Sequence, residues 1–104
     1  MNTLQYLDAV KATLNIESDY AVAKALGIRT STISNYRARG GQMDDDVARK
    51  VAKIIGKHPG IVTLDIHRER ANSPEDKAMW KEIFEGFHAL SLRANSIRGS
   101  ALLR

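Results

Sequence analysis

The sequence of 104 residues contains no cysteine. A disulfide framework and a thiolate metal site are therefore excluded, and the composition fits a reducing compartment. No apolar run approaches the ~20 residues of a membrane-spanning helix, and the first residues hold no apolar signal segment. We therefore expect a cytoplasmic protein without a membrane partner.

The residue patterns of catalytic and metal sites are also missing. No nucleophile motif surrounds a serine, and no glycine loop of the phosphate-binding type occurs. His58, His67 and His88 have no histidine partner at helical spacing, so we expect no zinc site. The run Asp44–Asp46 lacks the alternating ligands and the glycine of a calcium loop, and it is typical of a helix start. We expect no enzyme, no cofactor and no metal ion.

The sequence has instead a moderate excess of basic residues, with a net charge of +4. Residues 1–57 hold nine Lys/Arg against six acids, and residues 58–104 hold seven against six. A basic balance of this size permits a nucleic-acid partner without proving one. The length predicts one small domain with a modest core.

Apolar spacing predicts helices along the whole chain. Thr30 is the expected cap of the third helix, and Ser18 that of the second. The run Ile61–Thr63 is rich in β-branched residues, but a single strand would have no partner, so helix is favoured. The expected helices begin near residues 3, 18, 30, 44, 59 and 74.

Residues 18–39 predict two short helices that cross at a steep angle through a tight turn. The small Ala23 lies at the expected crossing, and Gly27 permits the turn. Ile33 fastens the second helix to the first, and Tyr36 also faces inward. These are the residues that we expect to hold the pair together.

The polar residues of the second helix are then expected to point outward. Ser31, Ser34 and Asn35 share one helical face, and Asn can make paired hydrogen bonds to adenine. Basic residues that can contact phosphates or base edges flank this helix, namely Lys24, Arg29, Arg37 and Arg39. The pattern indicates a protein that recognises DNA through contacts to its bases.

The residues Ala23, Gly27-Ile28, 31–34 and Tyr36 resemble the helix-turn-helix of the Cro/CI repressor family, also called Xre. The resemblance extends over Thr3–Lys57. The sequence of this segment is similar to those of small phage and prophage regulators. It implies an all-α, lambda-repressor-like bundle of four to five helices with additional C-terminal helices. It further implies base reading in the major groove by Thr30, Ser31, Ser34 and Asn35.

The sequence departs from the family pattern at two places. Many members begin the first helix of the pair with Gln, where this chain has Ser18 or Asp19. Many also cap the recognition helix with Ser or Thr, where this chain has Arg29. The register of the contacts to DNA therefore shifts by one residue if Thr30 is the cap.

The expected organisation has three parts: a DNA-binding domain over residues 1–57, a helical extension over 58–90 and a flexible basic tail over 91–104. The extension carries an apolar stripe whose residue types are enriched in interface cores. We expect it to form a homodimer interface through Met79, Trp80, Ile83, Phe84 and Phe87.

The sequence therefore predicts a sequence-specific transcriptional regulator, a phage or prophage repressor that binds a palindromic operator in double-stranded DNA as a homodimer. An alternative is an antitoxin-like protein of the same fold, which binds a protein partner through its C-terminal helices. A second alternative has no role in DNA binding and is an adaptor or a small enzyme.

Overall fold

Six α-helices make up most of the chain in the computed structural model, which describes the backbone of residues 1–102 and the side chains of residues 1–93. No strand occurs within residues 1–102, so the expected all-α class is confirmed and Ile61–Thr63 is helical. The helices are α1 (Thr3–Leu14), α2 (Asp19–Leu26), α3 (Thr30–Arg39), α4 (Asp45–Ile55), α5 (Pro59–Arg70) and α6 (Pro74–Leu102).

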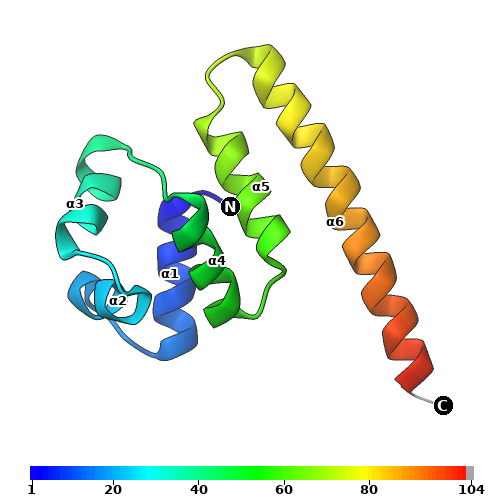
Figure 1. The fold of residues 1–104 in the computed structure, drawn as a ribbon, viewed down its shortest axis with the longest axis horizontal. Helices are drawn as coiled ribbons and strands as arrows, with labels where there is room; N and C mark the ends of the chain where they lie inside the picture. Colours follow the sequence, from blue (N-terminus) through cyan, green and yellow to red (C-terminus); the bar gives the residue numbers. More distant parts are fainter. Residues whose placement is uncertain (103–104) are drawn as a thin grey trace.

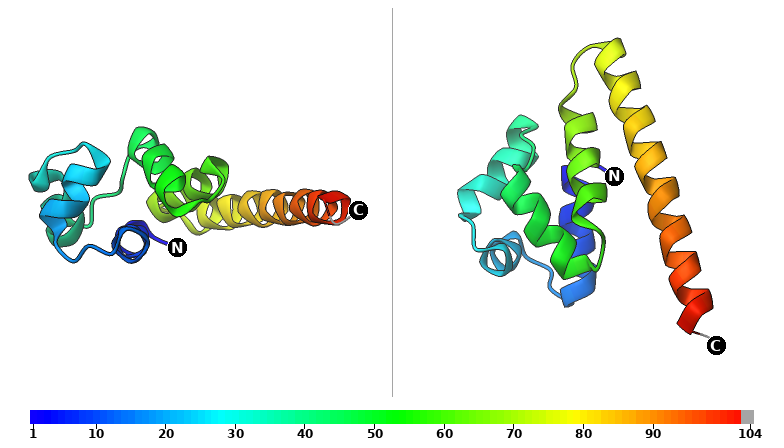
Figure 2. Two further views of the ribbon diagram at one scale, coloured as in Figure 1. Left: turned by 90° about the horizontal axis from the view of Figure 1, so that it is seen from below. Right: turned by 45° about the vertical axis from the view of Figure 1, so that its right-hand side comes forward.

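The helices follow one another across a flat molecule of 47 × 37 × 18 Å. Helix α1 contacts α2, α3 and α4; α4 also contacts α5, and α5 contacts α6. Helices α2 and α3 lie at one end of the longest axis, and α6 forms the other end (Figure 1). The two further views in Figure 2 show the same separation.

Local signals set most of the helix ends. Asn2 caps α1 in a reciprocal capping box with Gln5. Ser18 accepts a hydrogen bond from the Ala21 N–H, and Asp44 accepts one from the Val47 N–H. Gly27 ends α2 at φ +67°, a left-handed conformation in which a side chain would be strained. The predicted cap at Ser18 is confirmed, as is the predicted start of a helix at Asp44–Asp46.

The predicted cap of the third helix is wrong. Arg29, in an extended conformation, occupies the N-cap position of α3 and makes no side-chain cap hydrogen bond. Thr30 is the first helical residue, so its backbone is already inside the helix. The start of α3 therefore has orphan N–H groups that its own cap residue leaves unpaired.

The core is formed by one cluster that all of the first five helices enter. In α2, Val22, Ala23 and Leu26 are buried. In α1, Leu14 is exposed, and the buried face includes Tyr6 and Thr3. The core residues are Tyr6, Leu7, Val10, Val22, Ala23, Leu26, Ile33, Tyr36, Met43, Val47, Ala48, Val51, Ala52, Val62 and Ile66.

Helix α6 continues where the sequence predicts a flexible tail from residue 91. The helix is already established when the chain reaches that segment, and each further residue adds one hydrogen bond without a new nucleation cost. Ala, Leu and Arg residues, which favour helix, outweigh the single Gly99. The backbone through Leu102 is therefore helical, and residues 103–104 lie outside the described part.

Candidate nucleic-acid interface

The outward face of α3 carries the four predicted base-reading residues. Thr30, Ser31, Ser34 and Asn35 are all exposed. Their helix lies at the free end of the molecule, away from α5 and α6 (Figure 1). The Ser34 hydroxyl donates to the Thr30 carbonyl at 3.3 Å, a weak contact that leaves the hydroxyl oxygen available as an acceptor. The face therefore presents short neutral donors and acceptors to solvent.

The opposite face of α3 is fixed in the core. Ile33 is fully buried and Tyr36 is 7% exposed. Ala23 on α2 is buried as well, and the Ile28 N–H after the turn donates to the Ala23 carbonyl at 3.0 Å. Since a larger side chain at position 23 would separate α2 from its neighbours, these contacts fix the direction in which α3 points.

An ion-pair network joins α3 to α2 and α1. Arg37 donates twice to Asp19, from Nε at 2.7 Å and from a terminal nitrogen at 2.8 Å. Lys11 of α1 lies 3.0 Å from the same carboxylate. The hydrogen bond from Arg37 is the main reason that the pKa of Asp19 falls to about 2. The predicted phosphate ligand Arg37 is thus held within the protein by a bidentate pair.

The Asp19→Asn variant is expected to lose about 1 kcal/mol of unfolding free energy at pH 7, because a partly exposed network of this kind is worth little more. A lowered folded-state pKa means that the stabilisation is present above about pH 4 and disappears as the pH falls toward 2. Urea unfolding at both pH values checks this. Glu17→Gln, at an exposed acid in the α1–α2 connection, is the control. If the Asp19→Asn variant loses as much unfolding free energy at pH 2 as at pH 7, the stabilisation does not come from the ionised Asp19 carboxylate.

The three other predicted phosphate ligands lie on α2, on α3 or in the turn between them. Lys24 at the end of α2, Arg29 before α3 and Arg39 at its last turn are exposed. Within the described side chains, none of the three takes part in an ion pair. Their charges are therefore accessible to an anionic partner.

The run Asp44–Asp46 has structural partners. Asp44 caps α4, Asp45 lies 3.4 Å from the His67 ring nitrogen, and Asp46 faces Arg49 and Lys50 at 3.3 Å each. The interpretation of this run as a helix start is confirmed.

Relatives of the chain come from phages. Residues 63–99 match the family described as phage related protein, DUF3693. Protein Gp-c of Pseudoalteromonas phage PM2 is 32% identical over 85 residues, which cover 77% of this chain and 91% of the relative. The chain belongs to this phage-related protein family. No solved structure matches it.

The family match lies on α5 and α6, outside the half of this phage-related protein that resembles Cro/CI regulators. That resemblance therefore remains a prediction from sequence.

No helix in the described part of the chain is long and apolar enough to span a bilayer.

The phage-related protein also has a buried charged cluster that sequence reasoning missed. Asp65 of α5 is 3% exposed and accepts hydrogen bonds from the Tyr6 hydroxyl and, at 3.1 Å, from the Met1 amino group. Arg68 lies 3.4 Å from its other oxygen. Burial, followed by the hydrogen bond to Asp65, raises the pKa of Tyr6 above its ordinary value. The signal in the sequence that could have revealed this cluster is the position of Asp65, an acidic residue within the apolar row of α5.

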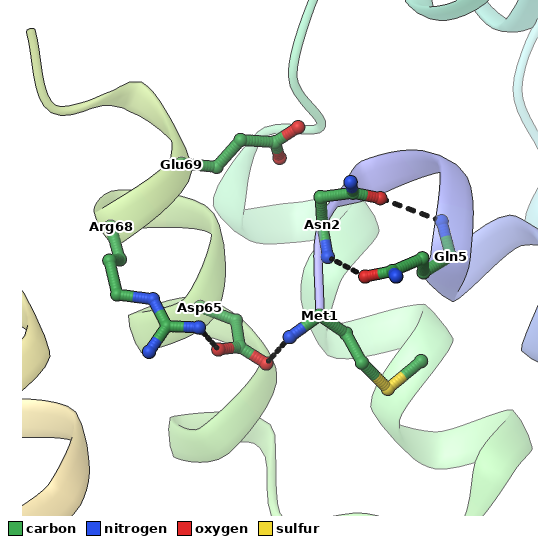
Figure 3. Close-up of a pocket in the computed structure, with 6 residues that line it drawn as sticks. All are labelled: Met1, Asn2, Gln5, Asp65, Arg68 and Glu69. Atoms are coloured by element: carbon green, nitrogen blue, oxygen red, sulfur yellow. Dashed lines mark hydrogen bonds and ion pairs between the residues drawn. The ribbon is translucent and has the colours of Figure 1, made fainter.

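This cluster borders a polar cavity of about 250 Å³ between α1 and α5 (Figure 3). Glu69, on the same wall, accepts hydrogen bonds from the Thr3 N–H at 3.0 Å and the Thr3 hydroxyl at 2.6 Å. Because the carboxylates of Asp65 and Glu69 are engaged by groups at the start of α1, we assign the cluster to joining α5 to the bundle.

Sequence reasoning also passed over an exposed aromatic residue that follows Asp19, the partner of Arg37 in α3. Tyr20, in the first turn of α2, is 67% exposed. The signal in the sequence that could have revealed its exposure is that this aromatic residue lies outside the apolar row of α2. A tyrosine hydroxyl is a common donor to phosphate.

Proposed function

We propose that this phage-related protein is a transcriptional regulator that binds duplex DNA in a sequence-specific manner, with α2 and α3 as a helix-turn-helix. The observation that carries the proposal is the exposed neutral face of α3, whose opposite side is held by buried Ile33 and Tyr36. A helix of this kind fits the major groove and places its N-terminal half on the base edges.

Each residue of the face has a role in the proposal. Asn35 makes paired hydrogen bonds to a base such as adenine, and the hydroxyls of Thr30, Ser31 and Ser34 donate to or accept from neighbouring base edges. The orphan N–H groups at the start of α3 favour a nearby phosphate, since no acidic residue stands in its first turn.

The basic residues divide into two groups in this proposal. Lys24, Arg29 and Arg39 hold phosphates on either side of the groove, because their charges are exposed. Arg37 orients α3 through Asp19 instead. The regulator acts by occupancy as a homodimer: it covers an operator and excludes the polymerase, with no chemistry and no cofactor.

The Asn35→Ala variant is expected to weaken binding to the selected operator by about 1–3 kcal/mol and to leave binding to unrelated duplex almost unchanged. Titration of an operator duplex and a scrambled duplex of equal length, each at two salt concentrations, separates the two effects. Ala78→Ser, at an exposed residue of α6 at the other end of the molecule from α3, is the control. Equal losses on both duplexes would count against base reading by Asn35.

A second candidate function is that of an antitoxin-like protein that binds another protein through α6. The exposed apolar residues Met79, Ile83 and Leu90 favour it. It predicts that residues 61–104 order only with the partner. Hydrogen exchange on the isolated protein distinguishes the two, since the regulator proposal requires protected amides in α5 and the first half of α6.

A further inference from the structure

Helix α6 has two apolar rows, and only one of them is covered. In the covered row, Trp80 stacks on His67 with ring centres 4.9 Å apart, and Phe87 meets His58 edge-on at 5.2 Å. Between them, the Arg68 guanidinium lies 5.0 Å from the Phe84 ring. Three of the five residues expected at a dimer interface are thus engaged by α5 and the residue before it.

The second row consists of Met79, Ile83 and Leu90, with exposed fractions of 46%, 44% and 66%. At 100° per residue, this row lies about 100° around the helix from the covered row. Gly86 falls on the same row, and a Cβ added there would meet nothing within 4 Å. The row has the alternating four- and three-residue spacing of a helix that pairs with another helix.

The charge of α6 is divided along its length. Residues 74–90 carry four acidic and two basic residues, whereas residues 91–102 carry two arginines and no acid. Two such helices side by side are attracted when they run in opposite directions, because the acidic part of each helix then lies alongside the part with a positive net charge. Parallel pairing would place like charges together.

We propose that a second copy of this chain docks on the Met79–Ile83–Leu90 row, with the two α6 helices antiparallel and crossing at Gly86. In this arrangement Ile83 of one copy meets Leu90 of the other, and the symmetry repeats the contact on the other side of Gly86. The missing side chain at Gly86 lets the two backbones approach at the crossing.

The antiparallel direction also places both α3 helices on one side of the dimer. Helices α5 and α6 lie side by side in the plane of Figure 1, so a row 100° from the α5 contact points out of that plane. The two-fold axis of an antiparallel pair then lies in the plane, perpendicular to α6, and points toward the end that carries α3. A parallel pair would send the two α3 helices to opposite ends.

The use of this dimer on DNA rests on the proposed function, whereas the contact itself is tested without DNA. Because the chain has no cysteine, introduced cysteines report the pairing directly. We expect the Ile83→Cys/Leu90→Cys double variant and the Gly86→Cys variant to form disulfide-linked dimers under mild oxidation. Ile83→Cys alone is expected to remain uncrosslinked. Self-crosslinking of Ile83→Cys would indicate parallel helices and overturn the proposal.

The Ile83→Glu variant is expected to raise the dimer dissociation constant by about 50-fold or more, because a charge is buried at the centre of the interface. Sedimentation equilibrium of the full chain measures this. Ala78→Glu adds the same charge at an exposed position outside the row and is expected to leave the dimer intact. A monomeric wild-type chain, or association only with a different protein, would overturn the proposal. A dimer that binds no DNA would refute the proposed function alone.

Discussion

The Asp65→Ala variant is expected to lower the free energy of unfolding by about 3–5 kcal/mol. Asp65 is almost completely buried, and its carboxylate faces Tyr6, Arg68 and the Met1 amino group. Its removal leaves the buried Tyr6 hydroxyl without its acceptor and two cationic groups without their counter-charge. A loss of this size is a large part of the stability of a small domain.

Urea unfolding followed by circular dichroism measures the effect. Asp65→Asn keeps the shape and one acceptor oxygen, so it is expected to lose less than Asp65→Ala. Tyr6→Phe removes only the hydroxyl and is also expected to fall between Asp65→Ala and the wild type. If Asp65→Ala unfolds at the same urea concentration as the wild type, the buried cluster does not hold α5 to α1.

The Ser31→Glu variant is expected to reduce binding to any duplex by about 1,000-fold, since a carboxylate in the groove faces the phosphates and like charges in an interface cost several kcal/mol. The same change is expected to raise the free energy of unfolding slightly. Ser31 lies in the first turn of α3, which has no acidic residue, and a negative charge there is favoured by about 0.3–1 kcal/mol.

The opposite signs of these two effects separate a role in DNA binding from a role in folding. Fluorescence anisotropy on labelled duplex and thermal unfolding measure the two quantities on one sample. Ser31→Gln has a similar size without the charge and is expected to lose much less affinity. Full retention of duplex binding by Ser31→Glu would place the DNA on another surface.

The sequence was sufficient where the determining contacts are local. The cap at Ser18, the start of α4 at Asp44 and the turn at Gly27 each depend on hydrogen bonds or backbone angles within a few residues. The start of α3 was missed by one residue because Arg29 stands at the N-cap without a side-chain bond, so the chain gives no capping signal there.

The sequence was insufficient where a contact joins distant segments. The pairing of Asp19 with Arg37 depends on how α2 and α3 cross, and the burial of Asp65 depends on Tyr6 of α1. The apolar neighbours of Asp65 indicate that it is buried, but for neither acid do the neighbours in sequence identify the partner. Apolar spacing identified α6, but only the position of α5 showed which of its residues are covered, as for Trp80, and which are not, as for Met79.

The most direct test of whether α3 reads duplex DNA is selection of bound sequences from a random duplex pool. We expect the wild-type chain to enrich a sequence with two-fold symmetry whose half-sites lie about one helical turn (~34 Å) apart. We expect Asn35→Ala to lose the preference at one position of each half-site. A pool that shows no enrichment, or an enriched sequence that is identical for Asn35→Ala, would contradict DNA reading by α3.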